Sequence, residues 1–181
     1  MNAADDLVPD FVAIDFETAN RSPRSAVAMA LVRVRSGEVA ERRTTLLRPP
    51  TRSFTFTRIH GIDAAKVADA PTFAAVWEST SDILAGAHFL AAHNASFDMN
   101  VLRACCDLAR APFPRQPWLC TVALARRTWS LEDATLPSVC RRLVLPLRHH
   151  DPSSDAAACA AIVCAAWPTE RGRAWLATFR R

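Results

Sequence analysis

The feature that most constrains the fold of this chain is a pair of acidic residues at the end of a short apolar run. Asp15 and Glu17 close the stretch Phe11-Val-Ala-Ile-Asp-Phe-Glu. On a β-strand, residues i and i+2 point to the same face, so the two carboxylates reach into one space. Ionised carboxylates are costly to bury unless they are paired or bound to metal. The pattern therefore predicts a strand that ends at a site for a hard divalent cation such as Mg²⁺ or Mn²⁺.

Two further motifs lie downstream of this pair. Asp98 ends the stretch His93-Asn-Ala-Ser-Phe-Asp, and His150 precedes Asp155 with four residues between them. In this order the three motifs resemble those of the DEDDh exonucleases, a group within the ribonuclease H-like superfamily that includes the proofreading subunit of bacterial DNA polymerase III. One motif alone would be weak evidence, whereas three in the right order are specific.

The resemblance covers nearly the whole chain, from about Phe11 to about Trp167, and includes the intermediate stretches Ile59-His60-Gly61-Ile62 and Ala70-Pro71-Thr72-Phe73. It implies an α/β ribonuclease H-like fold, with a mixed central sheet of three antiparallel strands followed by parallel additions, flanked by helices. We expect one exonuclease domain over residues 1–181, with a catalytic core at about 11–167 and a C-terminal helix or tail at 168–181.

Hydrophobic periodicity and turn residues indicate the same alternation of elements. Strands are expected at 11–15, 25–34 and 41–47, with Ser36-Gly37 as the turn between the last two, and shorter strands at 88–92 and 118–120. Helices are expected at 72–85, 96–109, 121–128 and 136–143, and from about 153 to just before Pro168.

Four carboxylates gathered in one cleft would repel one another strongly. At about 5 Å each pair costs ~3 kcal/mol at an effective dielectric near 20, which a marginally stable protein cannot sustain over several pairs. The cluster itself therefore argues for divalent cations. By resemblance, Asp15, Glu17 and Asp155 hold one Mg²⁺ or Mn²⁺ ion. Asp15 and the scissile phosphate hold a second, and Asp98 completes the site, so that two ions clamp the attacking and leaving oxygens.

His150 is the candidate general base for the attacking water. Its interval to Asp155 is that of the family, and an imidazole with a pKa near 6.5 can accept a proton at neutral pH. His149 competes for this role but is one residue too far from Asp155, and a simple surface histidine is the alternative. Pro152 stands where many relatives have alanine and is expected to stiffen a loop that otherwise moves.

The resemblance also suggests residues that bind the terminal nucleotide. Ile59 and His60 belong to the loop that packs against it, and Phe97 packs near its sugar. Thr18 is expected to hydrogen-bond the 3′ hydroxyl. Phe16 is a weaker candidate, because it lies between two metal ligands and points to the opposite face, where it can simply be core.

Composition fits an ordinary globular protein that can bind nucleic acid. Half of the residues are hydrophobic, 22% are charged, and the net charge is +4. The N-terminus lacks a signal-peptide pattern and the longest apolar run, 156–167, is too short to span a bilayer, so we expect a cytoplasmic protein with no membrane partner. The six cysteines lack zinc spacing and are expected to be buried reduced thiols.

The sequence thus predicts a stand-alone, metal-dependent 3′→5′ exonuclease that acts on single-stranded DNA or RNA 3′ ends and releases nucleoside 5′-monophosphates. Flanking arginines would hold the upstream phosphates. The alternative is a proofreading subunit in complex with a DNA polymerase, which is disfavoured because no polymerase-binding tail is recognisable. An inactive scaffold is disfavoured because all five catalytic-type residues are present. DNA versus RNA preference stays open, as does a homodimer.

Overall fold

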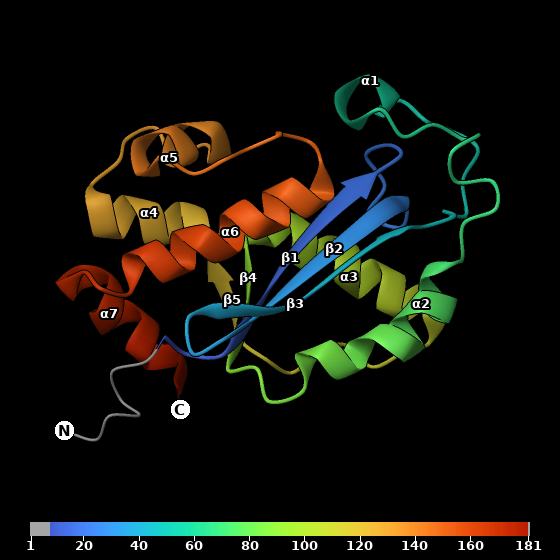
Figure 1. Cartoon of the computed structure of the whole chain (residues 1–181). Coiled ribbons are helices and arrows are strands. Elements are labelled where there is room, and N and C mark those ends of the chain that lie inside the picture. Colours follow the sequence, from blue (N-terminus) through green and yellow to red (C-terminus); the bar gives the residue numbers. More distant parts are fainter. Residues whose placement is uncertain (1–7, 181) are drawn as a thin grey trace.

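Five strands form one mixed β-sheet in the computed structural model, which describes residues 8–180 (Figure 1). Their order across the sheet is β3-β2-β1-β4-β5. The strands are β1 Phe11–Thr18, β2 Ala26–Arg35, β3 Glu38–Leu46, β4 Phe89–Ala92 and β5 Trp118–Cys120. The first three are antiparallel neighbours, whereas β4 and β5 run parallel to β1. The α/β mixed sheet expected from the sequence is confirmed.

A tight hairpin joins β2 to β3 at the predicted turn. Arg35 pairs with Glu38, so the loop consists of Ser36 and Gly37 alone, with φ angles of 51° and 87°. Two-residue loops with both φ angles positive follow the right-handed twist of the flanking strands. The hairpin fixes the register between β2 and β3, and the separate pairing of Thr18 with Ala26 places the start of β2 beside the end of β1.

Helices cover both faces of the sheet. They are α1 Thr57–His60, α2 Phe73–Thr80, α3 Ala95–Ala109, α4 Thr121–Trp129, α5 Leu136–Leu143, α6 Pro152–Ala166 and α7 Glu170–Leu176, with 3₁₀ turns at Ser81–Leu84 and Ala177–Arg180. Figure 1 shows α6 crossing one face of the sheet with α4 and α5 beside it, α3 behind the sheet, and α1 beyond the end of β1.

The alternation of side chains along β1 separates two cores. Phe11 and Ala13 pack with residues of α4, α5, α6 and α7, whereas Val12 and Ile14 pack with residues of α2 and α3. Successive residues of a strand point to opposite faces. Asp15 therefore continues the row of Phe11 and Ala13 and points to the face that α6 covers.

The starts of helices α3 and α6 position the acidic side chains of Asp98 and Asp155. The Asp151 carboxylate accepts a hydrogen bond from the Ser154 N–H at 3.1 Å and caps α6, and Pro152 occupies its first turn, where no N–H is required. Asn94 precedes α3 with a left-handed backbone, φ 66°. These caps place Asp98 and Asp155 in the first turns of α3 and α6, where the helix dipole favours a negative charge.

The helix expected at 72–85 is shorter than predicted: α2 ends at Thr80 and the chain continues as a 3₁₀ turn to Leu84. The short helix α1 was not predicted. After α7, Phe179 packs its ring 5.1 Å from that of Phe89, and Leu176 is fully buried, so this segment lies against the core. Within residues 8–180, no helix has the length and apolar character needed to cross a membrane.

Candidate active site

Three carboxylates converge where β1 ends and α6 begins. Asp15 and Glu17 come from β1 and Asp155 from the first turn of α6, and each contributes an oxygen that lies within 4.8 Å of the other two. The sheet register explains the convergence, because α6 packs over the face to which the two β1 carboxylates point. The structure thus brings together the three residues predicted to share one metal ion.

Asp98 approaches the same place from α3. Its Oδ1 accepts a hydrogen bond from the backbone N–H of Phe16 at 3.0 Å, and the side chain is only 1% exposed. Asp98 lies outside the group of three whose oxygens are all mutually close, but it is near enough that its charge raises the pKa of Asp15. It therefore both ties α3 to β1 and adds a fourth negative charge.

The pKa values of these carboxyl groups are raised because the groups are buried close to one another. Burial raises the pKa of Asp15 well above its usual value, and the charges of Asp98, Asp155 and Glu17 raise it further. Burial also raises the pKa of Glu17 to about 7, with a smaller contribution from Asp155. Added positive charge would lower these pKa values and favour the fully ionised cluster.

The arrangement fits a divalent cation. Asp15 Oδ2 and Asp155 Oδ1 are buried and have no hydrogen-bond donor within the described part of the chain. A buried carboxylate oxygen without a donor is costly, and a metal ion satisfies it. Since all ligand atoms are hard oxygens from several carboxylates, the site suits Mg²⁺, Mn²⁺ or Ca²⁺ better than a thiol-preferring ion.

Both histidines of the loop before α6 reach this cluster. The His150 ring lies with Nδ1 4.0 Å from Glu17 Oε1, and its backbone N–H donates to Asp155 Oδ2 at 3.0 Å. His149 Nδ1 lies 3.0 Å from the same Asp155 oxygen, and the two imidazole rings stack at 3.8 Å. Burial and the neighbouring His149 lower the pKa of His150, which keeps it neutral and able to accept a proton.

The sequence interval to Asp155 selected His150 as the candidate base, but it gave no reason to expect a contact between His149 and Asp155. His150 has a positive φ of 68°, and this left-handed residue turns the loop so that both rings face the carboxylates. Nothing in the sequence marks a non-glycine residue as left-handed. The position of His149 was therefore accessible only from the structure.

A cleft of about 260 Å³ lies next to the cluster and contains most of the predicted substrate-binding residues. Ile59 from α1 and Phe97 from α3 line it with side chains that are 49% and 42% exposed, a high exposure for large apolar groups. His60 Nε2 lies 3.1 Å from the Thr18 carbonyl oxygen, and its Nδ1 accepts the Ile62 N–H. His60 thus fixes α1 to the end of β1.

Phe16 is among the residues that line the cleft, but its ring lies in the core. Phe16 is 2% exposed and packs in the core with residues of α2 and α3, so only its backbone belongs to the site, where its N–H binds Asp98. The alternation of side chains along β1 is the reason, since Phe16 points away from Asp15 and Glu17. The packing favours the core role that was the alternative for Phe16, and substrate contact through its ring stays a prediction.

Two further residues, Phe56 and Leu136, line the cleft and were not predicted. The Phe56 N–H donates to the Ala19 carbonyl at 3.0 Å, which holds the residue beside the cleft. Its position three residues before Ile59 is the only signal in the sequence. His93 also lines the cleft; its Nδ1 lies 2.9 Å from Thr121 Oγ1, and burial lowers its pKa to about 4.

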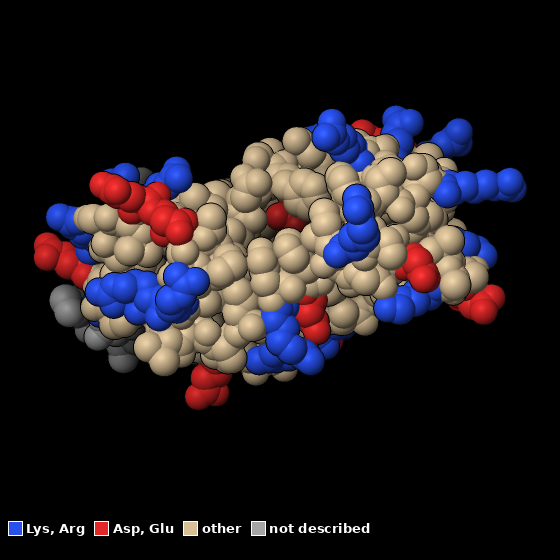
Figure 2. All heavy atoms as spheres, turned by 90° about the horizontal axis from the view of Figure 1, so that it is seen from above, with Lys and Arg blue, Asp and Glu red and all other residues tan. Residues whose placement is uncertain are grey.

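In Figure 2 the molecule is seen from the side of the cleft. Acidic atoms lie at the bottom of a central hollow, and lysine and arginine side chains stand at several places around it. A negative floor that attracts cations, surrounded by positive charge, is the arrangement expected for a site that handles a phosphate backbone.

Comparison with known proteins agrees with this geometry. Residues 12–163 match the family model described as exonuclease, RNase T type, and the chain belongs to this exonuclease family. It is 36% identical over 141 residues to a putative bifunctional exonuclease/endonuclease protein of Mycobacterium tuberculosis, covering 71% of this chain and 21% of the relative. It is 29% identical over 150 residues to DNA polymerase III of PolC type from Thermotoga maritima, covering 81% of this chain and 11% of the relative.

The structure is also similar to that of exonuclease X in complex with 5′ overhanging duplex DNA, with a TM-score of 0.72 and 28% identity over 88% of this chain and 92% of that one. The ribonuclease H-like exonuclease fold expected from the motifs is confirmed. The chain spans only 21% and 11% of the lengths of the two sequence relatives. Exonucleases of this type use divalent metal ions, and the three carboxylates are the candidate site for them.

Proposed function

We propose that this chain is a 3′→5′ exonuclease that shortens single-stranded nucleic acid with the help of two Mg²⁺ or Mn²⁺ ions and releases nucleoside 5′-monophosphates. One observation carries the proposal. Asp15, Glu17 and Asp155 converge beside a histidine and an open cleft, and two of their buried oxygens lack a donor in the described chain. The exonuclease family of the chain supplies the class of reaction.

The four carboxylates would act as ligands of the metal ions. Asp15, Glu17 and Asp155 would be the ligands of one ion, and Asp15 would share the second with the phosphate. Asp98 would complete the site while it holds the Phe16 backbone. When bound, the ions would neutralise the carboxylates and activate water for in-line attack on phosphorus.

His150 would take the proton from the attacking water. The water oxygen would form a bond to phosphorus while the bond from phosphorus to the upstream 3′ oxygen breaks. That oxygen would take up a proton from solvent and leave as the 3′ hydroxyl of the shortened strand. The proton of the water passes to a ring nitrogen of His150, whose pKa is lowered by burial and by His149. The hydrogen bond from the His150 N–H to Asp155 orients the loop for this transfer.

The cleft would bind the terminal nucleotide between Ile59 and Phe97, whose apolar side chains are exposed there. Thr18, at the end of β1 beside Glu17, would meet the 3′ hydroxyl. With the 3′ hydroxyl held beside Glu17, the cleft would bind a strand end, and we expect a continuous strand to be excluded.

A circular and a linear single strand of the same sequence test this proposal. With Mg²⁺, the linear strand is expected to be degraded and the circle to persist, and Asp15→Asn is expected to abolish nearly all turnover. Asp69→Asn, the same change on the exposed loop before α2, is the control and is expected to retain activity. Equal cleavage of the circle, or full activity in EDTA, would refute the proposal.

Proofreading within a polymerase is the second candidate, because DNA polymerase III of PolC type is similar over 81% of this chain. In that case the same site would act on mispaired 3′ ends delivered by a polymerase. Co-purification with a polymerase, together with a higher rate in the complex than alone, would favour this assignment over a free enzyme.

A further inference from the structure

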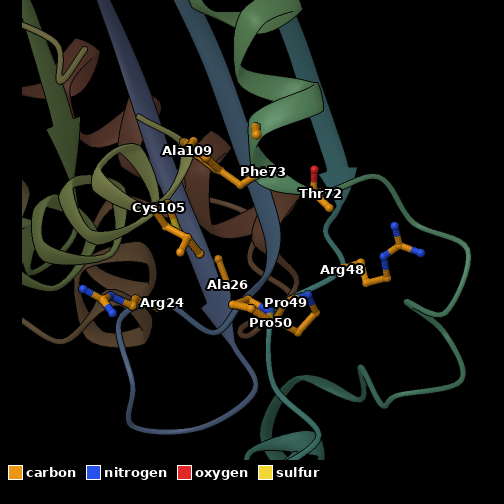
Figure 3. A pocket seen from close by; sticks show the side chains of 11 residues that line it. Arg24, Ala26, Arg48, Pro49, Pro50, Thr72, Phe73, Cys105 and Ala109 are labelled. Carbon is orange, nitrogen blue, oxygen red and sulfur yellow. The ribbon is translucent and has the colours of Figure 1, made fainter. Parts of the chain in front are cut away.

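A second hollow opens on the other side of the sheet end from the carboxylates. It has a volume of about 370 Å³ and lies between the start of β2, the start of α2 and the last turns of α3 (Figure 3). Its inner wall is apolar, and Figure 3 shows Arg24 on one side of it and Arg48 on the other. The lining residues are Arg24, Ala26, Arg48, Pro49, Pro50, Thr72, Phe73, Ala74, Cys105, Leu108 and Ala109, with no acidic side chain among them.

This hollow, which we call the Arg24–Arg48 hollow, is close to the active-site cleft in the fold. Ala26, on its wall, is the register partner of Thr18, which lines the cleft. The two places are thus on adjacent strands at the same end of the sheet. They are not the same pocket, since Phe73 and Cys105 belong to the core that α2 and α3 cover, whereas Asp15 points to the other face.

An intermediate hollow of about 510 Å³ lies between the cleft and the Arg24–Arg48 hollow. It lies between the 20–23 loop and α3, and it shares Thr18, Phe56 and Phe97 with the cleft. At its other end it is lined by Pro23, whose carbonyl oxygen lies 3.8 Å from Cys105 Sγ on the wall of the Arg24–Arg48 hollow. The two hollows are thus neighbours along α3, which lines both of them as well as the cleft.

The lining of the Arg24–Arg48 hollow is suited to binding one nucleotide of a strand. An apolar recess accommodates a base, and guanidinium groups on both sides can meet the phosphates that precede and follow it. Arg24 and Arg48 are exposed and take part in no ion pair among residues 8–180. The Arg48 guanidinium donates one long hydrogen bond to the Ala68 carbonyl oxygen at 3.5 Å, and its other N–H groups remain for a ligand. An apolar peptide would leave both charges without a partner.

We propose that the intermediate hollow and the Arg24–Arg48 hollow bind the upstream nucleotides of the single strand whose 3′ end lies in the cleft, with a base in the Arg24–Arg48 hollow and its flanking phosphates on Arg24 and Arg48. The inference rests on the proposed function, because it extends the path of the same substrate. It places the upstream strand along α3, and not across α5 and the loop that carries the two histidines.

Binding of fluorescein-labelled oligothymidylates in EDTA tests the path without cleavage. The double variant Arg24→Gln/Arg48→Gln is expected to bind a ten-nucleotide strand roughly tenfold more weakly at low salt, with the slope of log K against log salt reduced by ~1.4 for two lost phosphate contacts. The loss for a dinucleotide should be much smaller, because it does not reach the hollow.

The control is Arg35→Gln/Arg115→Gln, an equal change of charge at two exposed positions at the opposite end of the sheet. It is expected to bind and digest the ten-nucleotide strand as the wild type does. Leu108→Glu provides an independent variant, since Leu108 is 52% exposed on the wall of the hollow and a charge there need not affect folding. It should also weaken binding of the long strand.

Several outcomes would overturn the inference. Equal losses for the two double variants would mean that the arginines act only through net charge. Equal losses for the dinucleotide and the ten-nucleotide strand would mean that the hollow is not upstream of the cleft. Thymidine 5′-monophosphate binding that depends on Arg24 and Arg48 as strongly as the long strand does would make the hollow a separate nucleotide site. If the wild type binds the strand but never shortens it, the proposed function fails instead.

Discussion

Removing one negative charge from the carboxylate cluster should stabilise the protein when metal is absent. We choose Glu17→Gln, because Gln is nearly isosteric and the Glu17 side chain is only 13% exposed. The pKa of Glu17 rises from 4.5 to about 7 in the folded protein, mainly through burial. The native state therefore binds more protons than the unfolded state between these values, and the free energy of unfolding falls as pH rises through this range.

The size of the effect follows from the same values. A pKa that rises from 4.5 to about 7 corresponds, at about 1.36 kcal/mol per pH unit, to a cost of ~3 kcal/mol above pH 7, and partial exposure reduces it to about 2–3 kcal/mol. Glu17→Gln in EDTA at pH 8.5 should therefore be more stable than the wild type by about this amount, or about 5–10 °C in Tm. At pH 5 the gain should fall below about 1 kcal/mol.

Urea unfolding followed by circular dichroism measures the free energy of unfolding of both proteins at pH 8.5 and pH 5. Glu78→Gln, on the exposed surface of α2, is the matched control and should change stability by less than about 0.5 kcal/mol. With saturating Mg²⁺ the wild type should be more stable than Glu17→Gln, because it binds the ion more tightly and gains more stability from it. A Glu17→Gln protein that is no more stable than the wild type at pH 8.5 in EDTA would refute the reasoning.

Two further substitutions have defined outcomes. His150→Ala should lower kcat by roughly 10²–10⁴-fold with KM little changed, whereas His149→Ala should cost much less; initial rates measure both, and interchanged effects would identify His149 as the base. Gly172→Ala should lower the free energy of unfolding by about 1–3 kcal/mol, because the added Cβ would lie 2.1 Å from the Ala166 carbonyl oxygen. An unchanged urea midpoint for Gly172→Ala would show that α7 can shift away from α6.

The parts of the fold that depend on local sequence were predicted well. The alternation along β1 placed Asp15 and Glu17 on one face, and the Ser36-Gly37 turn placed the hairpin, because both follow from the geometry of neighbouring residues. The sites of Asp98 and Asp155 in the first turns of α3 and α6 also followed from local patterns. That these turns meet at the end of β1 was known only through the family resemblance.

What sequence could not provide were contacts between distant segments. The contact of His149 with Asp155 depends on the left-handed backbone of His150, which no local pattern indicates. The position of Phe56 in the cleft depends on a hydrogen bond to Ala19, far away in the sequence. The hollow between Arg24 and Arg48 likewise forms only after β2, α2 and α3 have packed together.

The most direct test of the central claim is the direction of degradation. A linear single strand with a 5′ fluorescent label and a free 3′ hydroxyl is incubated with the wild type and Mg²⁺, and the products are separated by gel at early times. The account predicts a ladder of labelled strands that shorten by one nucleotide at a time, and resistance of the same strand with a 3′ phosphate. Immediate release of the label as a mononucleotide, with the rest of the strand intact, would contradict it.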